Sequence, residues 1–174
     1  ENLRMVNNSI VDERTLHEIY LTGFEIAVKE GSPQAIMTSY NKINGIYSNE
    51  NRELLMDILR RQWKFQGAVI TDWGGSNDHV EGVRAGSSIE MPGTGGDSDR
   101  QLLEAVKRKD IEEKVIDQRA SEMLKLIEEA GNHRKDAYSV KEHHEMAYQA
   151  ALESMVLLKN EDNLLPLRKG ARAA

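Results

Sequence analysis

Hydrophobic residues recur along the first half of the chain in blocks that alternate between helical and strand-like spacing. Residues 12–30 carry apolar side chains at intervals of three and four, which predicts an amphipathic helix with Asp12 as its N-cap. Residues 35–39 form a short apolar run between breakers, which predicts a buried strand. A second helix over 49–63 and a second buried strand over 68–71 repeat the pattern.

The repetition continues with a short helix over 76–85 and a third strand over 88–91, followed by a glycine-rich loop. Alternating helices and strands predict an α/β fold, in which a parallel sheet has its helices outside. A (β/α)8 barrel and a doubly wound sheet both fit this pattern. No phosphate-binding Gly-x-Gly-x-x-Gly motif or P-loop follows any strand, which counts against nucleotide binding.

The second half of the chain is predicted to be helical. Helices are expected over 98–108, 112–130 and 142–156, with Gly131 as the break between the last two. An apolar segment with a proline follows the last helix. This change in character predicts a domain boundary near residue 131.

Composition and charge narrow the classes of partner and site. The 174 residues carry a net charge of −6 and no basic run, so we expect no nucleic-acid partner. Cysteine is absent, which excludes disulfides and thiolate metal sites within the sequence. No stretch has the length and apolarity of a membrane span, and no signal-peptide pattern opens the chain, so we expect a cytoplasmic protein, with secretion left open. Both ends look cut, and the chain is interpreted as a fragment.

The candidate chemistry lies where strands end. Asp72 directly follows the apolar run 68–71. Burying a carboxylate there costs free energy unless it has polar partners, so its presence indicates such partners or a functional role. Trp73 beside it offers a flat apolar surface of the kind on which sugar rings stack, and Tyr40 brings a hydroxyl to the neighbouring strand end. Two structural explanations stand beside this one: Asp72 as a helix N-cap and Tyr40 as a half-buried packing residue. Trp63 is expected in the core.

Three histidines in the second half of the chain are weaker candidates, as metal ligands. His143 and His144 are adjacent and so point to different faces of a helix, with His133 nearby, and no His-Glu-x-x-His motif is present. We therefore predict no metal site.

Ordered segments over almost the whole chain resemble glycoside hydrolase family 3, which includes β-glucosidases. The matching segments are Val11 to Tyr20, Met37 to Gly45, Leu54 to Gly67, Ile70 to Trp73, Ala85 to Pro92 and Glu153 to Leu167. The resemblance implies a partial (β/α)8 TIM-type barrel followed by a helical linker. Residues 1–130 would be the C-terminal part of the barrel domain, and residues 131–174 the linker and the start of a second α/β domain.

The resemblance also implies roles for four residues. Asp72 would be the catalytic nucleophile, Tyr40 would hydrogen-bond it, Trp73 would wall the sugar site and Met37 would lie near it. The implied reaction is retaining hydrolysis of terminal β-D-glucosyl or related residues of an oligosaccharide or aryl β-glycoside, without a cofactor. Such a reaction uses two carboxyl groups about 5 Å apart.

The family's acid/base glutamate would lie beyond this sequence, and Glu90 is interpreted as structural, satisfied by backbone N–H groups. We therefore expect the isolated chain to be inactive and to associate with copies of itself through exposed barrel edges. The chain departs from the family pattern at Lys64 and Gln66, and at Ser87-Ser88 in place of Leu-Asp. The alternative function is a non-catalytic sugar-binding or assembly module that kept the family fold.

Overall fold

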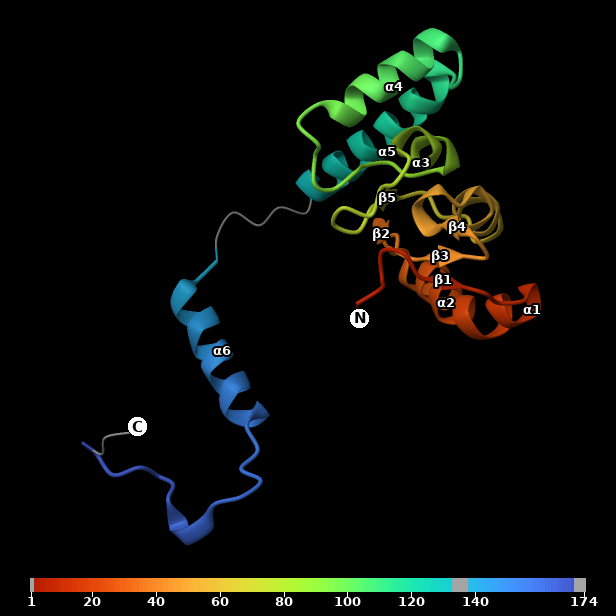
Figure 1. Ribbon diagram of the computed structural model, residues 1–174. Coiled ribbons are helices and arrows are strands. Elements are labelled where there is room, and N and C mark those ends of the chain that lie inside the picture. Colours follow the sequence, from red (N-terminus) through yellow and green to blue (C-terminus); the bar gives the residue numbers. More distant parts are fainter. Residues whose placement is uncertain (1, 133–137, 171–174) are drawn as a thin grey trace. The chain divides into compact units, whose positions relative to one another are not determined.

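The structure is a computed structural model that describes residues 2–132 and 138–170, and the chain divides into two compact units, Glu1–His133 and Arg134–Ala174 (Figure 1). The helical elements of the first unit are α1 (Glu13–Thr15), the π-helix η1 (Leu16–Leu21), α2 (Thr22–Gly31), the 3-10 helix η2 (Ser48–Glu50), the π-helix η3 (Glu53–Gln62), α3 (His79–Ala85), α4 (Asp97–Arg108) and α5 (Glu113–Asn132). Its strands are β1 (Asn8–Ser9), β2 (Ala35–Met37), β3 (Lys42–Ile43), β4 (Ile46–Tyr47) and β5 (Ala68–Ile70).

The described residues of the second unit form α6 (Val140–Ser154) and the 3-10 helix η4 (Glu161–Asn163). The break predicted at Gly131 is wrong by two residues, because α5 continues through this glycine to Asn132. Nothing lies within 4 Å of the position of a Cβ on Gly131, and one glycine in the last turn of a 20-residue helix costs only about 1 kcal/mol relative to alanine. The assignment of residues 131–174 to a linker and a second domain stays a prediction.

The parallel sheet predicted from the repeated units is present but short. Strands β2 and β5 pair in parallel, with Met37 opposite Ile70, and Ile70 also forms a parallel bridge with Ile89. The predicted third strand over 88–91 is reduced to this single bridge. Gly67 allows the sheet to form, since a Cβ there would lie 2.2 Å from the carbonyl oxygen of Gln34. The unit is therefore α/β, with parallel strands and helices around them.

Residues 42–47 form a small hairpin. Strands β3 and β4 pair antiparallel, and β3 also pairs in parallel with β1. Asn44 and Gly45 form the turn of this hairpin, and both have left-handed backbone angles, with φ of 50° and 92°, as a two-residue hairpin turn requires. The Asn44 side chain also binds both backbone groups of Val11, at 2.9 and 2.8 Å, which holds the N-terminal segment beside the hairpin.

The first predicted helix is confirmed, but its apolar stripe does not face the core as a whole. Asp12 caps it, and the hydrogen bond from the Thr15 N–H (3.0 Å) lowers the pKa of the Asp12 carboxyl. The π-helical turns of η1 contain more residues than α-helical turns, so residues three and four apart no longer share one face. Only Leu21 and Val28 of η1 and α2 are buried, whereas Ile19, Tyr20, Phe24 and Ala27 of the predicted stripe are exposed.

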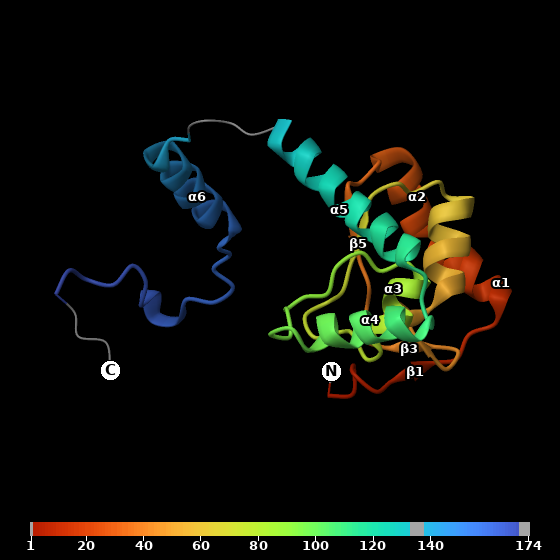
Figure 2. The same ribbon diagram turned by 90° about the horizontal axis from the view of Figure 1, so that it is seen from above.

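The main core lies between η3 and the β2–β5 sheet. It contains Trp63, as predicted, together with other buried residues: Leu21, Val28, Leu55, Ile58, Leu59, Phe65, Val69 and Ala85. A second cluster of Val83, Ala105 and Ile111 packs α3 against α4 and the start of α5. Figures 1 and 2 show β5 in the interior of this unit, with α3 and α5 close by. The strand that leads to Asp72 is thus the most enclosed one.

Candidate active site

Asp72 lies at the carboxyl end of β5, at the start of a turn formed by residues 72–75. Asp72 as a whole residue is half-buried, and one oxygen of its carboxylate accepts the N–H of Trp73 at 2.6 Å. The Gly75 N–H donates to the Asp72 carbonyl at 2.8 Å and closes the turn. Asp72 is not the N-cap of the next helix, since Asp78 has that role and accepts the Glu81 N–H.

Tyr40 and Met37 reach the same edge of the sheet from the neighbouring strand. The Tyr40 hydroxyl donates to the carbonyl oxygen of Trp73 at 2.8 Å, so it contacts the residue that follows Asp72. Met37 ends β2 and is 63% exposed. Because β2 and β5 run parallel in register, the structure brings these two residues beside the Asp72 turn.

Trp73 presents its ring to solvent. Its side chain and backbone together are 64% exposed, although a tryptophan ring is among the most apolar surfaces a protein has. An exposed indole next to a carboxylate can stack on a sugar ring while the carboxylate acts at the anomeric carbon. The four residues selected from the sequence therefore lie at the ends of two adjacent strands.

The segment after Ile89 supports the Asp72 turn. The Met91 carbonyl accepts the N–H of Gly74 at 2.7 Å, and the Thr71 hydroxyl bonds to both backbone groups of Met91. Gly74 has a φ of 77°, a backbone angle that favours glycine. Sequence reasoning missed Thr71, because its partner lies 20 positions away and no local pattern marks such a contact.

Glu90 has a side-chain partner that the sequence did not predict. Its carboxylate lies 3.3 Å from His79 Nδ1, and both side chains are mostly buried. The interpretation of Glu90 as structural pointed to backbone N–H groups, whereas the side chain beside its carboxylate is that of His79 at the start of α3. No signal in the sequence joins the two residues.

A buried ionic cluster lies on the side of β5 covered by α5. The Arg60 guanidinium donates to the Glu122 carboxylate (2.8 Å), the Gly86 carbonyl (3.1 Å) and the Ser88 hydroxyl (3.3 Å). Ser88 in turn accepts the Val69 N–H at 2.9 Å and donates to Glu122 at 2.5 Å. Ser88, one of the departures from the family pattern, thus connects β5 to α5.

Burial lowers the pKa of both arginines in this cluster. Loss of hydration disfavours the charged form of Arg60 and Arg119, and the Glu122 carboxylate opposes that effect. Within the described residues, the Nε groups of both arginines are buried without a hydrogen-bond partner. The single carboxylate of Glu122 therefore offsets two buried positive charges.

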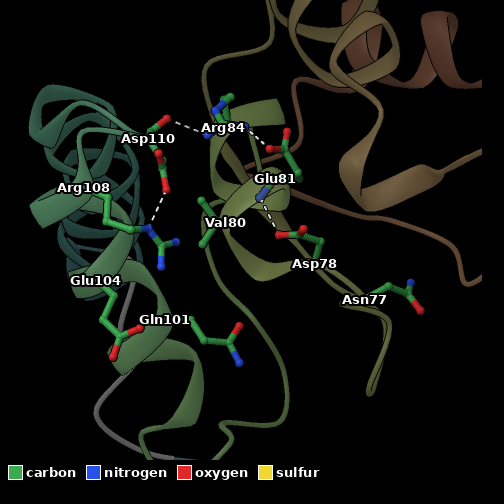
Figure 3. Close-up of a pocket in the computed structure, with 9 residues that line it drawn as sticks. All are labelled: Asn77, Asp78, Val80, Glu81, Arg84, Gln101, Glu104, Arg108 and Asp110. Atoms are coloured by element: carbon green, nitrogen blue, oxygen red, sulfur yellow. Dashed lines mark hydrogen bonds and ion pairs between the residues drawn. The ribbon is translucent and has the colours of Figure 1, made fainter.

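A separate open pocket of about 580 Å³ lies between α3 and α4 and is lined by none of the four predicted site residues (Figure 3). Figure 3 shows Arg84 between Glu81 and the backbone of Asp110, and Arg108 bonded to the Asp110 carboxylate at 2.8 Å. These charges bind one another, so the pocket is a solvated polar groove. Among the residues that the structure describes, no three His, Asp or Glu side chains converge as metal ligands, and none of the helices found there combines the length and apolarity needed to cross a membrane.

Comparison with known proteins identifies the family. The model of the glycosyl hydrolase family 3 N-terminal domain matches residues 5–126. The chain is 46% identical to thermostable β-glucosidase B of Acetivibrio thermocellus, and the match covers all of this chain and 23% of that protein. It is 40% identical to an exo-α-(1→6)-L-arabinopyranosidase of Bifidobacterium breve, and that match covers 98% of this chain and 23% of the relative. β-Glucosidase 3B of Thermotoga neapolitana, solved with glucose, superposes with a TM-score of 0.76 at 39% identity, over 95% of this chain and 24% of that one. The 174 residues span about a quarter of each of these proteins, and they belong to glycosyl hydrolase family 3.

Proposed function

We propose that this chain is part of a retaining glycoside hydrolase in which Asp72 is the nucleophile. The observation that carries the proposal is the position of Asp72: a half-buried aspartate at the end of the most enclosed strand, beside an exposed tryptophan. The names of the relatives, β-glucosidases above all, support hydrolysis of a terminal β-D-glucosyl or related residue of an oligosaccharide or aryl β-glycoside. The family match supports reading the parallel strands as part of a (β/α)8 barrel.

The proposed reaction is a double displacement. The Asp72 carboxylate attacks the anomeric carbon and forms a glycosyl ester, while a carboxylic acid protonates the departing glycosidic oxygen. Water then attacks the same carbon and gives its proton to that second carboxylate, and the Asp72 carboxylate is released. The Trp73 ring would stack on the sugar, with Met37 at the edge of the site. Tyr40, which binds the Trp73 carbonyl, would steer the turn and the charge of Asp72.

The acid/base carboxylate is proposed to come from outside these 174 residues. Glu90, a carboxylate at a comparable strand end, is mostly buried against His79. The chain also spans only about a quarter of its relatives, so other sugar-binding residues would lie elsewhere. Double displacement needs both carboxyl groups and a positioned substrate, and general acid catalysis alone contributes about 10²–10⁴-fold.

The isolated chain should therefore be close to inactive. Hydrolysis of an aryl β-glucoside with a poor leaving group should stay at background, and any residual reaction should appear first with a dinitrophenyl glucoside, which needs little acid assistance. Release of the chromophore measures both rates. Steady turnover of cellobiose by the purified chain would contradict the proposal and would place an acid within it.

The assignment of the nucleophile is tested by Asp72→Asn in the full-length protein that contains this chain. The substitution removes the nucleophile with little change in volume, so kcat should fall by about 10⁴-fold or more with a retained melting temperature. Asp78→Asn is the matched control, because Asp78 lies on the same loop and an asparagine still caps α3. A 2-deoxy-2-fluoro glycoside should label Asp72, as read by peptide mass spectrometry, and a label on another residue would overturn the assignment.

The alternative function, a non-catalytic sugar-binding or assembly module, predicts a different result in the same experiment. The exposed Trp73 ring can hold a sugar without any chemistry. In that case calorimetry would detect glucoside binding that Trp73→Ala abolishes, while the fluorosugar would label nothing and Asp72→Asn would change neither binding nor turnover.

A further inference from the structure

At the strand end that carries Asp72, a side chain extends the backbone bonds that join β5 to the segment around Ile89. Three backbone bonds join β5 to this neighbour: the N–H groups of Ser88 and Ile89 donate to the Val69 carbonyl at 2.8 and 3.2 Å, and the Thr71 N–H donates to the Ile89 carbonyl at 3.1 Å. The Thr71 hydroxyl then accepts the Met91 N–H at 2.8 Å and donates to the Met91 carbonyl at 3.2 Å. Thr71 is only 2% exposed, so water does not compete for these bonds.

The same carbonyl holds the other end of the turn. The Gly74 N–H donates to Met91 O at 2.7 Å, so Met91 binds the residue before Asp72 and the second residue after it. Tyr40 fixes the turn at a third point, through the Trp73 carbonyl. The carboxylate of Asp72 thus starts from a backbone that is anchored on both sides.

We infer that Thr71 is a positioning residue for the nucleophile: its hydroxyl ties the end of β5 to Met91 and sets the direction of the Asp72 carboxylate. The inference rests on the proposed function. A reacting group that is misplaced by about 1 Å can lose roughly 10²-fold in rate, so a small shift of this turn is enough to matter. The contacts of Thr71 do not include the substrate, and its effect passes through Asp72.

The test compares Thr71→Val with Thr71→Ser in the full-length protein. Valine keeps the shape and removes the hydroxyl, whereas serine keeps the hydroxyl and removes the methyl group. A dinitrophenyl 2-deoxy-2-fluoro glycoside counts the active sites by its burst and gives the rate of labelling for each site. We expect Thr71→Val to lower this rate and kcat by about 10- to 100-fold with a KM within about threefold, and Thr71→Ser to stay within about threefold of the unsubstituted protein.

Thr94→Val is the matched control. The Thr94 hydroxyl also accepts a backbone N–H, that of Ser98 at 3.0 Å, but this bond lies at the start of α4. This variant should lower the melting temperature with no change in the labelling rate per site. A purely structural role for Thr71 would give the same pattern, in which active sites are lost but each remaining site reacts normally.

Several results would overturn the inference. Labelling of Asp72 at the unsubstituted rate in Thr71→Val would do so while leaving the proposed function intact, and so would equal impairment of the valine and serine variants. If neither Thr71→Val nor Thr71→Ala folds, the hydroxyl serves the fold as a whole and the positioning role is rejected. A fluorosugar that labels no residue, or one other than Asp72, would instead reject the proposed function.

Discussion

Strands β5 and β2 are neighbours in one sheet but have contrasting surroundings. β5 has a partner on each side, and Ala68 and Val69 have no exposed surface. Among the described strands β2 pairs only with β5, and Met37 at its end is 63% exposed. The sheet is therefore complete around the strand that leads to Asp72 and open on the far side of β2.

The helices that precede the two strands repeat this contrast. The π-helix η3, before β5, buries Leu55, Ile58 and Leu59. In η1 and α2, before β2, large apolar side chains are exposed: Ile19, Tyr20, Phe24 and Ile26. The apolar face of η3 is thus buried in the core, whereas η1 and α2 expose apolar surface that further protein can cover.

The largest effect is expected where the enclosed strand is joined to α5. Glu122→Gln leaves the buried guanidiniums of Arg60 and Arg119 without their carboxylate, and breaking a buried pair in this way typically costs about 3 kcal/mol or more. Asp57→Asn breaks an exposed pair with Arg61 and should cost less than about 1 kcal/mol. Urea unfolding of the chain measures both, and equal costs would remove the contrast between the two environments.

A smaller difference should separate the two strands themselves. Val69→Ala removes fully buried methyl groups and should lower the free energy of unfolding by roughly 2 kcal/mol, since burying a valine side chain contributes about that much. Met37→Ala acts on an exposed side chain and should change it by less than about 0.5 kcal/mol. A destabilisation at Met37 as large as that at Val69 would mean that something covers the end of β2 in solution.

The weakest expected effect is self-association. We propose that the open edge of β2 and the exposed apolar face of η1 and α2 pair with a second copy of the chain, because unpaired strand edges and apolar patches are the usual routes to association. Light scattering should show a mass that rises with concentration, and Met37→Lys should reduce this rise, because charge on an edge strand opposes pairing. A monomer at all concentrations would show that the open side is tolerated in water.

The sequence predicted the elements whose pattern extends over several residues. Period-three and period-four spacing located the helices, and the apolar runs located β2 and β5. The two-residue strands β3 and β4 are too short to produce a pattern, and the π-helical turns of η1 cannot be recognised from spacing that assumes α-helical turns. The length of the third strand was overestimated: of residues 88–91, Ile89 alone pairs as a strand residue.

The sequence could predict which residues belong to the candidate site, because their positions at strand ends follow from the order of elements along the chain. Strand ends of a parallel sheet meet at one edge, which is enough to group Asp72 with Tyr40 and Trp73. The contacts that hold this group depend on residues distant in sequence, such as Thr71 with Met91 and Arg60 with Glu122. Neither pair has a spacing or motif that could identify it before the fold is known.

The position of Glu122 also affects the order in which contacts around the strand that leads to Asp72 can form as the protein is made. Translation delivers β2 first, then β5, then the segment with Ile89, so all three parts of this sheet are synthesised before α5. The carboxylate that neutralises Arg60 arrives only with α5, well after Asp72 itself. The ion pair between Arg60 and Glu122 can therefore form only after α5 has been synthesised, later than the strands of the sheet.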